Sequence, residues 1–122
     1  ISYHKVNQIR ESDSCRTCAN PGKISGYLAP GGYGVRVDSH VYQDYEIPPH
    51  YDSMIGKLIC WGRDRNEARR RMYRALKEYV ITGVETTIPF HQEIIEDEVF
   101  MSGNFNTGFI EDFYKRICIA CF

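Results

Sequence analysis

The hydrophobic pattern of this chain changes its period once, from alternation in the first half to helical spacing in the second. Residues 35–42 alternate between apolar and polar side chains, which is typical of a half-buried strand. Residues 65–81 instead carry apolar side chains every three or four positions, which predicts an amphipathic helix. Strands followed by helices favour an α+β fold over alternating βαβ units. We therefore predict an antiparallel β-sheet with two to three flanking helices.

The strands are separated by residues with special backbone requirements. A turn at residues 29–34 contains a proline and three glycines, and the strand that follows it has two unlike faces. Val35, Val37, Ser39 and Val41 are expected on one face, and Arg36, Asp38, His40 and Tyr42 on the other. Residues 54–62 are mostly apolar and carry glycines, so we expect a buried strand there.

The helical half begins at a capping motif. Asp64 and Glu67 have the spacing of a capping box, which predicts a helix from about Arg65 to Ile81 that stops at Gly83. A second helix is expected near Pro89, and a third, shorter one at residues 107–114. The apolar residues expected on the inner faces are Ala68, Met72, Ala75, Leu76, Tyr79, Val80, Phe90, Ile94, Ile95, Phe109, Ile110 and Phe113.

Length and charge limit the classes of function. A chain of 122 residues fits one small domain, and it has no apolar run long enough to span a bilayer. No secretory signal is visible, and the missing initiator methionine suggests a processed or partial chain. The net charge of −1 favours neither nucleic acid nor a membrane surface as a partner.

Charge is nevertheless uneven along the sequence. Residues 57–77 contain eight Lys and Arg against two acids, whereas residues 85–112 contain seven acids and no Lys or Arg. The run Arg69–Arg71 with Arg74 raises the hypothesis of nucleic-acid binding. The alternative is a solvated helix face, with some arginines pairing the acidic segment or a partner. Consecutive helical residues point in different directions, so this run cannot form a single stripe.

Cysteine and histidine residues offer weak metal hypotheses. Cys15 and Cys18 form one Cys-x-x-Cys pair and Cys118 and Cys121 another, which could together bind zinc. The pairs lie at opposite ends of the chain, however, whereas zinc ribbons space them by about 15–20 residues. Two free thiol pairs are therefore the favoured interpretation. The histidines, at 4, 40, 50 and 91, do not show a metal-ligand spacing.

Arg36 is the strongest candidate for a functional side chain. It lies in mid-strand on the polar face, directly after the glycine-rich turn. Its planar and permanently charged guanidinium suits a carboxylate, a bicarbonate or an enolate-type oxyanion. The alternative is an exposed arginine paired with Asp38 or Glu46. The glycines of the turn do not indicate a phosphate loop, because a strand follows them instead of a helix.

Several strings of the sequence resemble the C-terminal domain of biotin carboxylase. They are Pro21–Ile24, Ala29–Arg36, Ser39–His40 and Pro48–Cys60. The string from Tyr51 to Leu58 is long and specific, and looks most like the stand-alone subunit of multi-subunit acetyl-CoA carboxylase. The resemblance covers residues 21–113 as one domain. It leaves residues 1–20 and 114–122 unmatched.

The resemblance implies part of a ligase that carboxylates biotin on a carrier protein, using ATP, bicarbonate and Mg²⁺. In that family the arginine of Gly-Val-Arg, here Arg36, faces the active site and stabilises the biotin enolate or positions bicarbonate. The family's upstream motif, with its metal ligands and base, does not carry over to His4–Asp13. The ATP-grasp region has no match in the chain. We therefore assign no cofactor or metal ligand, and expect the 122 residues to be inactive alone.

The implied partners are the rest of the biotin carboxylase subunit, the biotin carboxyl carrier protein and a second copy in a homodimer. Neither nucleic acid nor a membrane is expected as a partner. The implied setting is fatty acid synthesis in the cytoplasm, with the plastid and mitochondrial matrix as alternatives. The rival hypothesis is a non-catalytic binding or assembly module, or a decayed paralogue, that docks on a carboxylase subunit.

Overall fold

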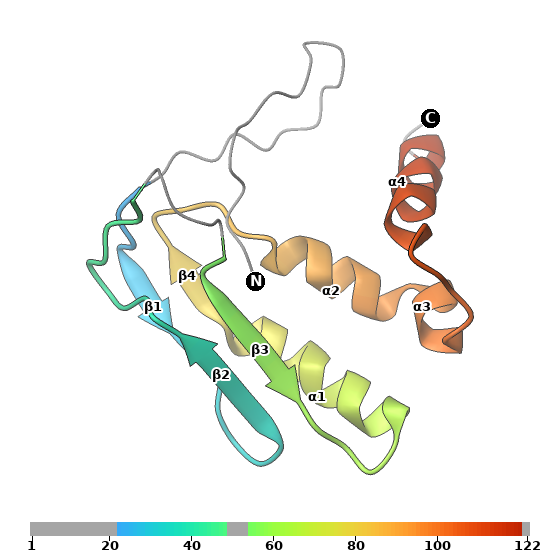
Figure 1. Cartoon of the computed structure of the whole chain (residues 1–122), viewed down its shortest axis with the longest axis horizontal. Helices are drawn as coiled ribbons and strands as arrows, with labels where there is room; N and C mark the ends of the chain where they lie inside the picture. Colours follow the sequence, from blue (N-terminus) through green and yellow to red (C-terminus); the bar gives the residue numbers. More distant parts are fainter. Residues whose placement is uncertain (1–21, 49–53, 121–122) are drawn as a thin grey trace.

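The computed structural model of the chain describes residues 22–48 and 54–120, which form four strands and four helices (Figure 1). The strands are β1 (Gly26–Leu28), β2 (Val35–Ser39), β3 (Gly56–Cys60) and β4 (Val80–Thr82). The helices are α1 (Arg65–Glu78), α2 (Ile88–Glu96), α3 (Glu98–Ser102) and α4 (Phe109–Ala120). The predicted α+β class is confirmed.

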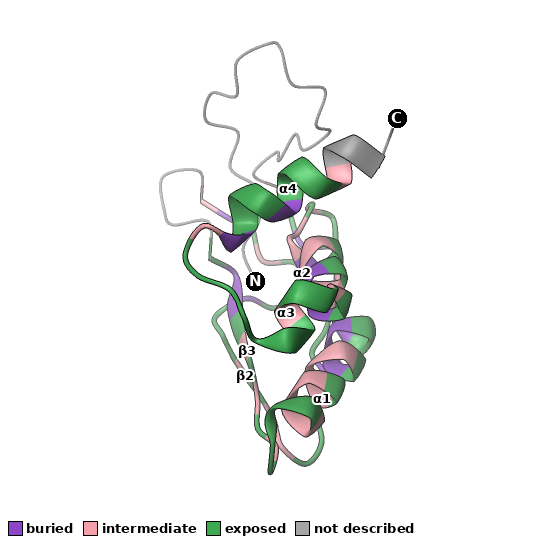
Figure 2. Ribbon diagram, turned by 90° about the vertical axis from the view of Figure 1, so that its right-hand side faces the viewer, coloured by how far each residue is buried: buried purple, intermediate pink, exposed green. Residues whose placement is uncertain are grey.

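The strands pair in two antiparallel ladders. β1 pairs with β4, with Gly26 opposite Thr82, and β2 pairs with β3, with Val35 opposite Cys60 and Ser39 opposite Gly56. Antiparallel pairing is as predicted, but within the described residues it is divided between two ladders of two strands. Helix α1 packs against one side of β2 and β3, as Figure 2 shows.

The start of α1 is as predicted, and its end is not. Asp64 Oδ1 accepts a hydrogen bond of 2.7 Å from the Glu67 amide, which caps the helix. The helix ends at Glu78, not Ile81, and Val80 leads into β4 with 42% of its surface exposed. Three β-branched residues in a row suit a strand better than a helix, and the edge of β1 supplies their partner.

β3 is half-buried, which corrects the prediction of a buried strand. Gly56 is buried and Leu58 is partly buried. Lys57 and Ile59, which alternate with them along the strand, are exposed. The reason is that α1 covers only one face of the ladder. Because the residues of a strand alternate between its two faces, every second side chain is left outside.

The helical end is more divided than predicted. α2 contains Pro89 in its first turn, and Ile94 and Ile95 are buried as expected. The short helix α3 was not predicted: Asp97 caps it by accepting from the amides of Val99 and Phe100, and it ends at Gly103 with a φ of 74°. α4 follows, with 41% of Ile110 exposed, against expectation.

The apolar side chains form three buried clusters, which appear purple in Figure 2. They are Ile24, Val41, Ile47 and Ile55; Leu76, Tyr79 and Ile88; and Ile94, Phe109 and Phe113. The first two clusters lie against the strands, and the third joins α2 to α4. None of the helices within the described ranges combines the length and the apolar character that crossing a bilayer requires.

Candidate functional site

Arg36 lies on the face of the β2–β3 ladder that α1 does not cover. In the register of the ladder Arg36 is opposite Ile59, and Asp38 is opposite Lys57. Opposite residues share a face, so these four exposed side chains line one surface, which we call the Arg36 face. The predicted outward orientation of Arg36 and Asp38 is confirmed. The other face, with Val37 and Leu58, packs towards α1.

The guanidinium of Arg36 is oriented by one carboxylate and remains accessible. Its Nη2 donates a hydrogen bond of 3.0 Å to Asp38 Oδ2, which is one of the two pairings expected from the sequence. The two side chains are 70% and 49% exposed. Because exposed ion pairs contribute at most about 1 kcal/mol, this contact orients the guanidinium more than it stabilises the fold. An anion could approach the exposed nitrogens.

Contacts behind the Arg36 face hold β2 in place. Ser39 Oγ donates to the carbonyl of Ile55 at 2.9 Å, and the hydroxyls of Tyr27 and Tyr79 share a hydrogen bond of 3.1 Å. Burial, followed by the hydrogen bond with Tyr27, raises the pKa of Tyr79 far above its usual range, so the hydroxyl stays protonated. A Cβ on Gly56 would lie 3.2 Å from the Tyr79 hydroxyl, which shows how closely the ladder approaches this residue.

The turn before Arg36 is also fixed. Gly34 has a φ of 73°, and its carbonyl accepts a hydrogen bond of 2.8 Å from the amide of Trp61. Arg71 donates to the Trp61 carbonyl at 2.6 Å and lies over the ring of Tyr33, 4.9 Å from its centroid. Arg71 of α1 thereby connects the loop that contains Tyr33 with the loop that contains Trp61. Both loops lie at the end of the ladder where β2 begins, close to Arg36.

The other candidates do not join this site. His40 stacks edge-on against Tyr45, with ring centroids 5.6 Å apart. His91 Nε2 and Thr87 Oγ1 share a hydrogen bond of 3.1 Å, and burial lowers the pKa of this histidine. Among the described side chains, in residues 22–48 and 54–117, no three His, Cys, Asp or Glu residues gather as a metal site would require. The side chains of the zinc hypothesis lie outside the described part; they are Cys15, Cys18, Cys118 and Cys121. The side chain of His50 lies outside it as well.

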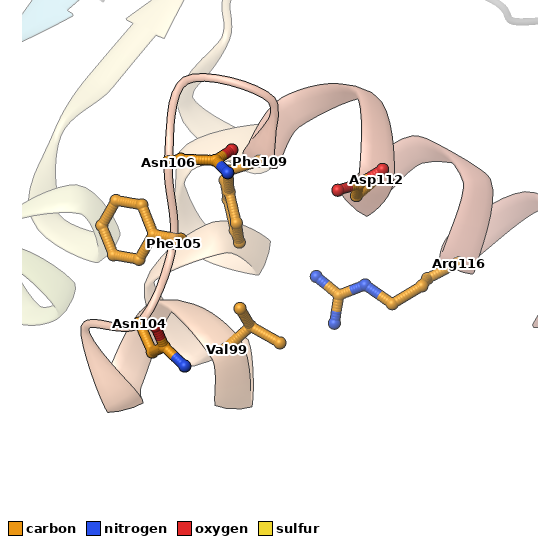
Figure 3. Close-up of a pocket in the computed structure, with 7 residues that line it drawn as sticks. All are labelled: Val99, Asn104, Phe105, Asn106, Phe109, Asp112 and Arg116. Carbon is orange, nitrogen blue, oxygen red and sulfur yellow. The ribbon is translucent and has the colours of Figure 1, made fainter.

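The residues that the structure describes do not fit ATP or Mg²⁺. The glycine-rich turn leads into β2, so no helix N-terminus follows this turn to bind a phosphate. The hollow in Figure 3, between α3 and α4, has a volume of about 210 Å³. Ligand pockets usually measure about 300–1,000 Å³, so this one is small for a nucleotide. One carboxylate, Asp112, and one guanidinium, Arg116, line it beside Phe105 and Phe109.

The arginines of α1 mainly serve contacts inside the chain. Arg69 donates to the carbonyl of Ile95 at 3.3 Å, at the end of α2, and Arg65 donates to that of Phe100 at 2.6 Å, in α3. Carbonyls at a helix C-terminus carry partial negative charge, which favours a cation there. These two arginines therefore contact the backbone of the acidic segment, whereas the sequence suggested pairing with its charges.

Lys57 and Ile59 are the members of the Arg36 face that the sequence did not reveal. The sequence of β3 is Gly-Lys-Leu-Ile-Cys. Lys57 marks one exposed position, but the apolar Ile59 hides the alternation between exposed and buried side chains. The register with β2 carries the missing information, because it places Ile59 opposite Arg36. Pairing β3 with the clearly alternating residues 35–39 would have identified both.

Comparison with known proteins identifies the family. The profile of the biotin carboxylase C-terminal domain matches residues 9–112. A pyruvate carboxylase subunit of Methanothermobacter thermautotrophicus is 61% identical over 98 residues, which cover 80% of this chain and 20% of that protein. Biotin carboxylase of Nostoc sp. is 62% identical over 95 residues, 78% of this chain and 21% of that protein.

A solved structure gives the same result. It is the biotin carboxylase domain dimer of Hydrogenobacter thermophilus 2-oxoglutarate carboxylase in complex with MgADP, ADP and bicarbonate. The match has a TM-score of 0.73 and 45% identity, and covers 75% of this chain and 20% of that one. The chain thus spans about a fifth of the length of the relatives it matches. It belongs to the biotin carboxylase C-terminal domain family.

Proposed function

We propose that this chain forms the C-terminal part of a biotin carboxylase, an ATP- and bicarbonate-dependent ligase that carboxylates biotin on a carrier protein. The observation that carries the proposal is the placement of Arg36. Its guanidinium is exposed on a strand that is fixed from behind by Ser39 and from one end by the Gly34 turn. Membership of the family supports the same conclusion.

In this proposal Arg36 is the catalytic residue of the chain. When biotin is activated, negative charge develops on an enolate-type oxygen, and bicarbonate is itself an anion. A preorganised guanidinium that does not titrate near neutral pH stabilises either charge. The related carboxylase domain named above was crystallised with bicarbonate, which fits an anion-binding role for the family.

The remaining groups belong to other parts of the enzyme in this proposal. ATP and Mg²⁺ would be bound by the rest of the subunit, because the described residues do not fit them. The partners would be that remainder, the biotin carboxyl carrier protein and a second copy of the enzyme. The matched proteins are named as carboxylases or their subunits, which favours a catalytic role over an assembly module. A cytoplasmic location stays a prediction.

The final acceptor is the finer part of the proposal, and we propose acetyl-CoA, in fatty acid synthesis. Its support is the resemblance of residues 51–58 to the stand-alone subunit of acetyl-CoA carboxylase. Carboxyl transfer from purified carrier protein to acetyl-CoA or to pyruvate, with the matching transferase, tests it. Transfer to pyruvate alone would overturn this part and leave the biotin carboxylase proposal intact.

The main test uses a complete enzyme. Residues 22–112 would replace the matching stretch of the Nostoc biotin carboxylase, and bicarbonate-dependent ATP cleavage with free biotin would be measured. Arg36→Ala should lower kcat/KM by roughly 10²–10³, the usual loss when one oxyanion-stabilising donor is removed. Arg70→Ala, on an exposed position of α1, is the matched control and should retain the parent activity. Equal activity of both variants would contradict the proposal.

A further inference from the structure

The Arg36 face contains a carboxylate for which the proposed function has not yet given a role. Asp38 lies two residues after Arg36 on the same face, and its Oδ2 accepts the hydrogen bond from Arg36 Nη2 at 3.0 Å. We propose that Asp38 is a positioning residue, which holds the guanidinium of Arg36 in its reactive orientation. This inference rests on the proposed function of Arg36.

The ladder places one cation beside this carboxylate along β2 and another opposite it on β3. Asp38 is directly opposite Lys57 in the register, and opposite side chains on one face have Cβ atoms about 4.5–5.5 Å apart. The order of charges across the face is therefore Lys57, Asp38 and Arg36. The Asp38 carboxylate offers Arg36 an acceptor, and the next residue of the strand, Ser39, is fixed by its hydrogen bond to the carbonyl of Ile55.

The stability of the fold does not explain the ion pair between Arg36 and Asp38 well. Both side chains are largely exposed, so the ion pair adds little to the free energy of folding. An arginine side chain, however, loses rotamer entropy when it is immobilised. An acceptor that orients it before the substrate arrives reduces the part of this cost that falls on the reaction step.

Because Asp38 is negatively charged, a positioning role and simple charge repulsion predict opposite effects of removing it. A carboxylate near an anion site repels the anion, so by charge alone its removal would improve anion binding. If Asp38 positions Arg36, its removal must instead slow the chemical step. The two roles therefore move kcat and the KM for bicarbonate differently.

The first experiment measures both constants for Asp38→Asn in the complete enzyme described above. The variant keeps the size of the side chain and removes its charge. We expect kcat to fall about tenfold, as for other residues that orient a functional group, and the KM for bicarbonate to stay equal or fall. The matched control is Asp44→Asn. It removes the exposed ion pair between Asp44 and Lys23, which has the same length of 3.0 Å and lies outside the Arg36 face.

This control is conformationally mild, because Asp44 has a φ of 70° and asparagine tolerates that region well. It should leave both constants unchanged. A rise in kcat in Asp38→Asn, or an unchanged kcat with a lower KM for bicarbonate, would overturn the proposal, since it would show that Asp38 only competes with the anion for Arg36.

The second experiment replaces the guanidinium chemically. Millimolar guanidinium chloride, with sodium chloride as the salt control, should restore part of the activity lost in Arg36→Ala, because Asp38 can still hold the free cation. The double variant Arg36→Ala/Asp38→Asn should show no rescue. A loss of stability alone would not produce this difference.

The outcomes separate the two proposals. Parent-level kcat in Asp38→Asn together with full rescue of the double variant would overturn the positioning role, while a loss in Arg36→Ala would still support the proposed function. Parent-level activity of Arg36→Ala itself would overturn both.

Discussion

The β2–β3 ladder and the helical end of this domain use their side chains in opposite ways. The ladder buries one face against α1 and leaves the Arg36 face exposed. At the helical end, Phe109 and Phe113 of α4 pack against Ile94 of α2. The ring of Phe90 stacks on that of Tyr114, with ring centroids 5.2 Å apart. Under the proposed function, the ladder separates folding from function by strand face, whereas the aromatic cluster serves folding. Substitutions should reveal the same separation.

The largest expected effect on stability comes from the aromatic cluster. Phe113 is 4% exposed and lies 5.7 Å, between ring centroids, from both Phe90 and Phe109. Phe113→Ala should lower the free energy of unfolding by about 3–5 kcal/mol, measured by urea denaturation of the 122-residue chain. Phe105→Ala, at a ring 42% exposed, should cost clearly less. Equal losses in the two variants would show that the cluster is not the core of this end.

An intermediate effect is expected at the turn that links the Arg36 face to α1. A Cβ on Gly34 would lie 2.6 Å from Arg71 Nη1 and 2.9 Å from the Trp61 carbonyl, at a φ of 73°. Gly34→Ala should therefore cost about 1–3 kcal/mol and also lower kcat, because the start of β2 must shift. The matched control is Gly31→Ala, whose added Cβ would meet nothing within 4 Å. If both variants behaved alike, the turn would not position Arg36.

A smaller effect, with a characteristic pH dependence, is expected at the start of α3. Burial alone would raise the pKa of Asp97, but hydrogen bonds from Arg116 and from the amides of Phe100 and Val99 outweigh it and lower that pKa. Its stabilisation is therefore complete above the unfolded pKa and is lost as the pH falls through the folded pKa. Asp97→Asn keeps a capping oxygen but loses the charge that pairs with Arg116, so it should cost up to about 1 kcal/mol at neutral pH.

The pH dependence supplies the check on this prediction. Below about pH 4, near the pKa of an aspartate in an unfolded chain, the stability of the parent should fall more steeply than that of Asp97→Asn. The comparison requires thermal or urea unfolding at a series of pH values. Parallel curves for the two proteins would mean that Asp97 does not hold its charge through these contacts.

The smallest effect on stability is expected on the Arg36 face itself. Because its ion pair with Asp38 is exposed, Arg36→Ala should change the free energy of unfolding by less than about 1 kcal/mol, although under the proposed function it should remove most of the activity. Circular dichroism during urea unfolding would measure this. A loss as large as that of Phe113→Ala would contradict the separation of folding from function in the ladder.

Much of this arrangement follows from local sequence signals. Alternation after a glycine-rich turn places Arg36 outward, and Asp64 with Glu67 marks the start of α1. β4 could not be predicted in the same way, because Val80–Thr82 follow the helical pattern without a break and become a strand only through pairing with β1. The five residues of α3 are too few to show a period.

The exposure of Ile59 was unpredictable for a similar reason. An apolar residue in an apolar run gives no sign of which face it occupies, and only the position of α1 decides it. The proposed role of Arg36 does not follow from the hydrophobic pattern. Alternation shows only that Arg36 points outward, and its suitability for an anion follows from the chemistry of its guanidinium.

The pairing of β1 with β4 also has a consequence for the order in which the domain can fold. Gly26 meets Thr82, so β1 must wait through the synthesis of both β2 and β3 and the whole of α1 before its partner exists. Contacts between residues so distant in sequence form slowly, whereas a helical segment assembles from neighbours. During that delay β1 presents an unsatisfied strand edge, which is a template for pairing with other chains. A ribosome-bound intermediate that ends before residue 80 should therefore be the species most prone to aggregation and most in need of a chaperone.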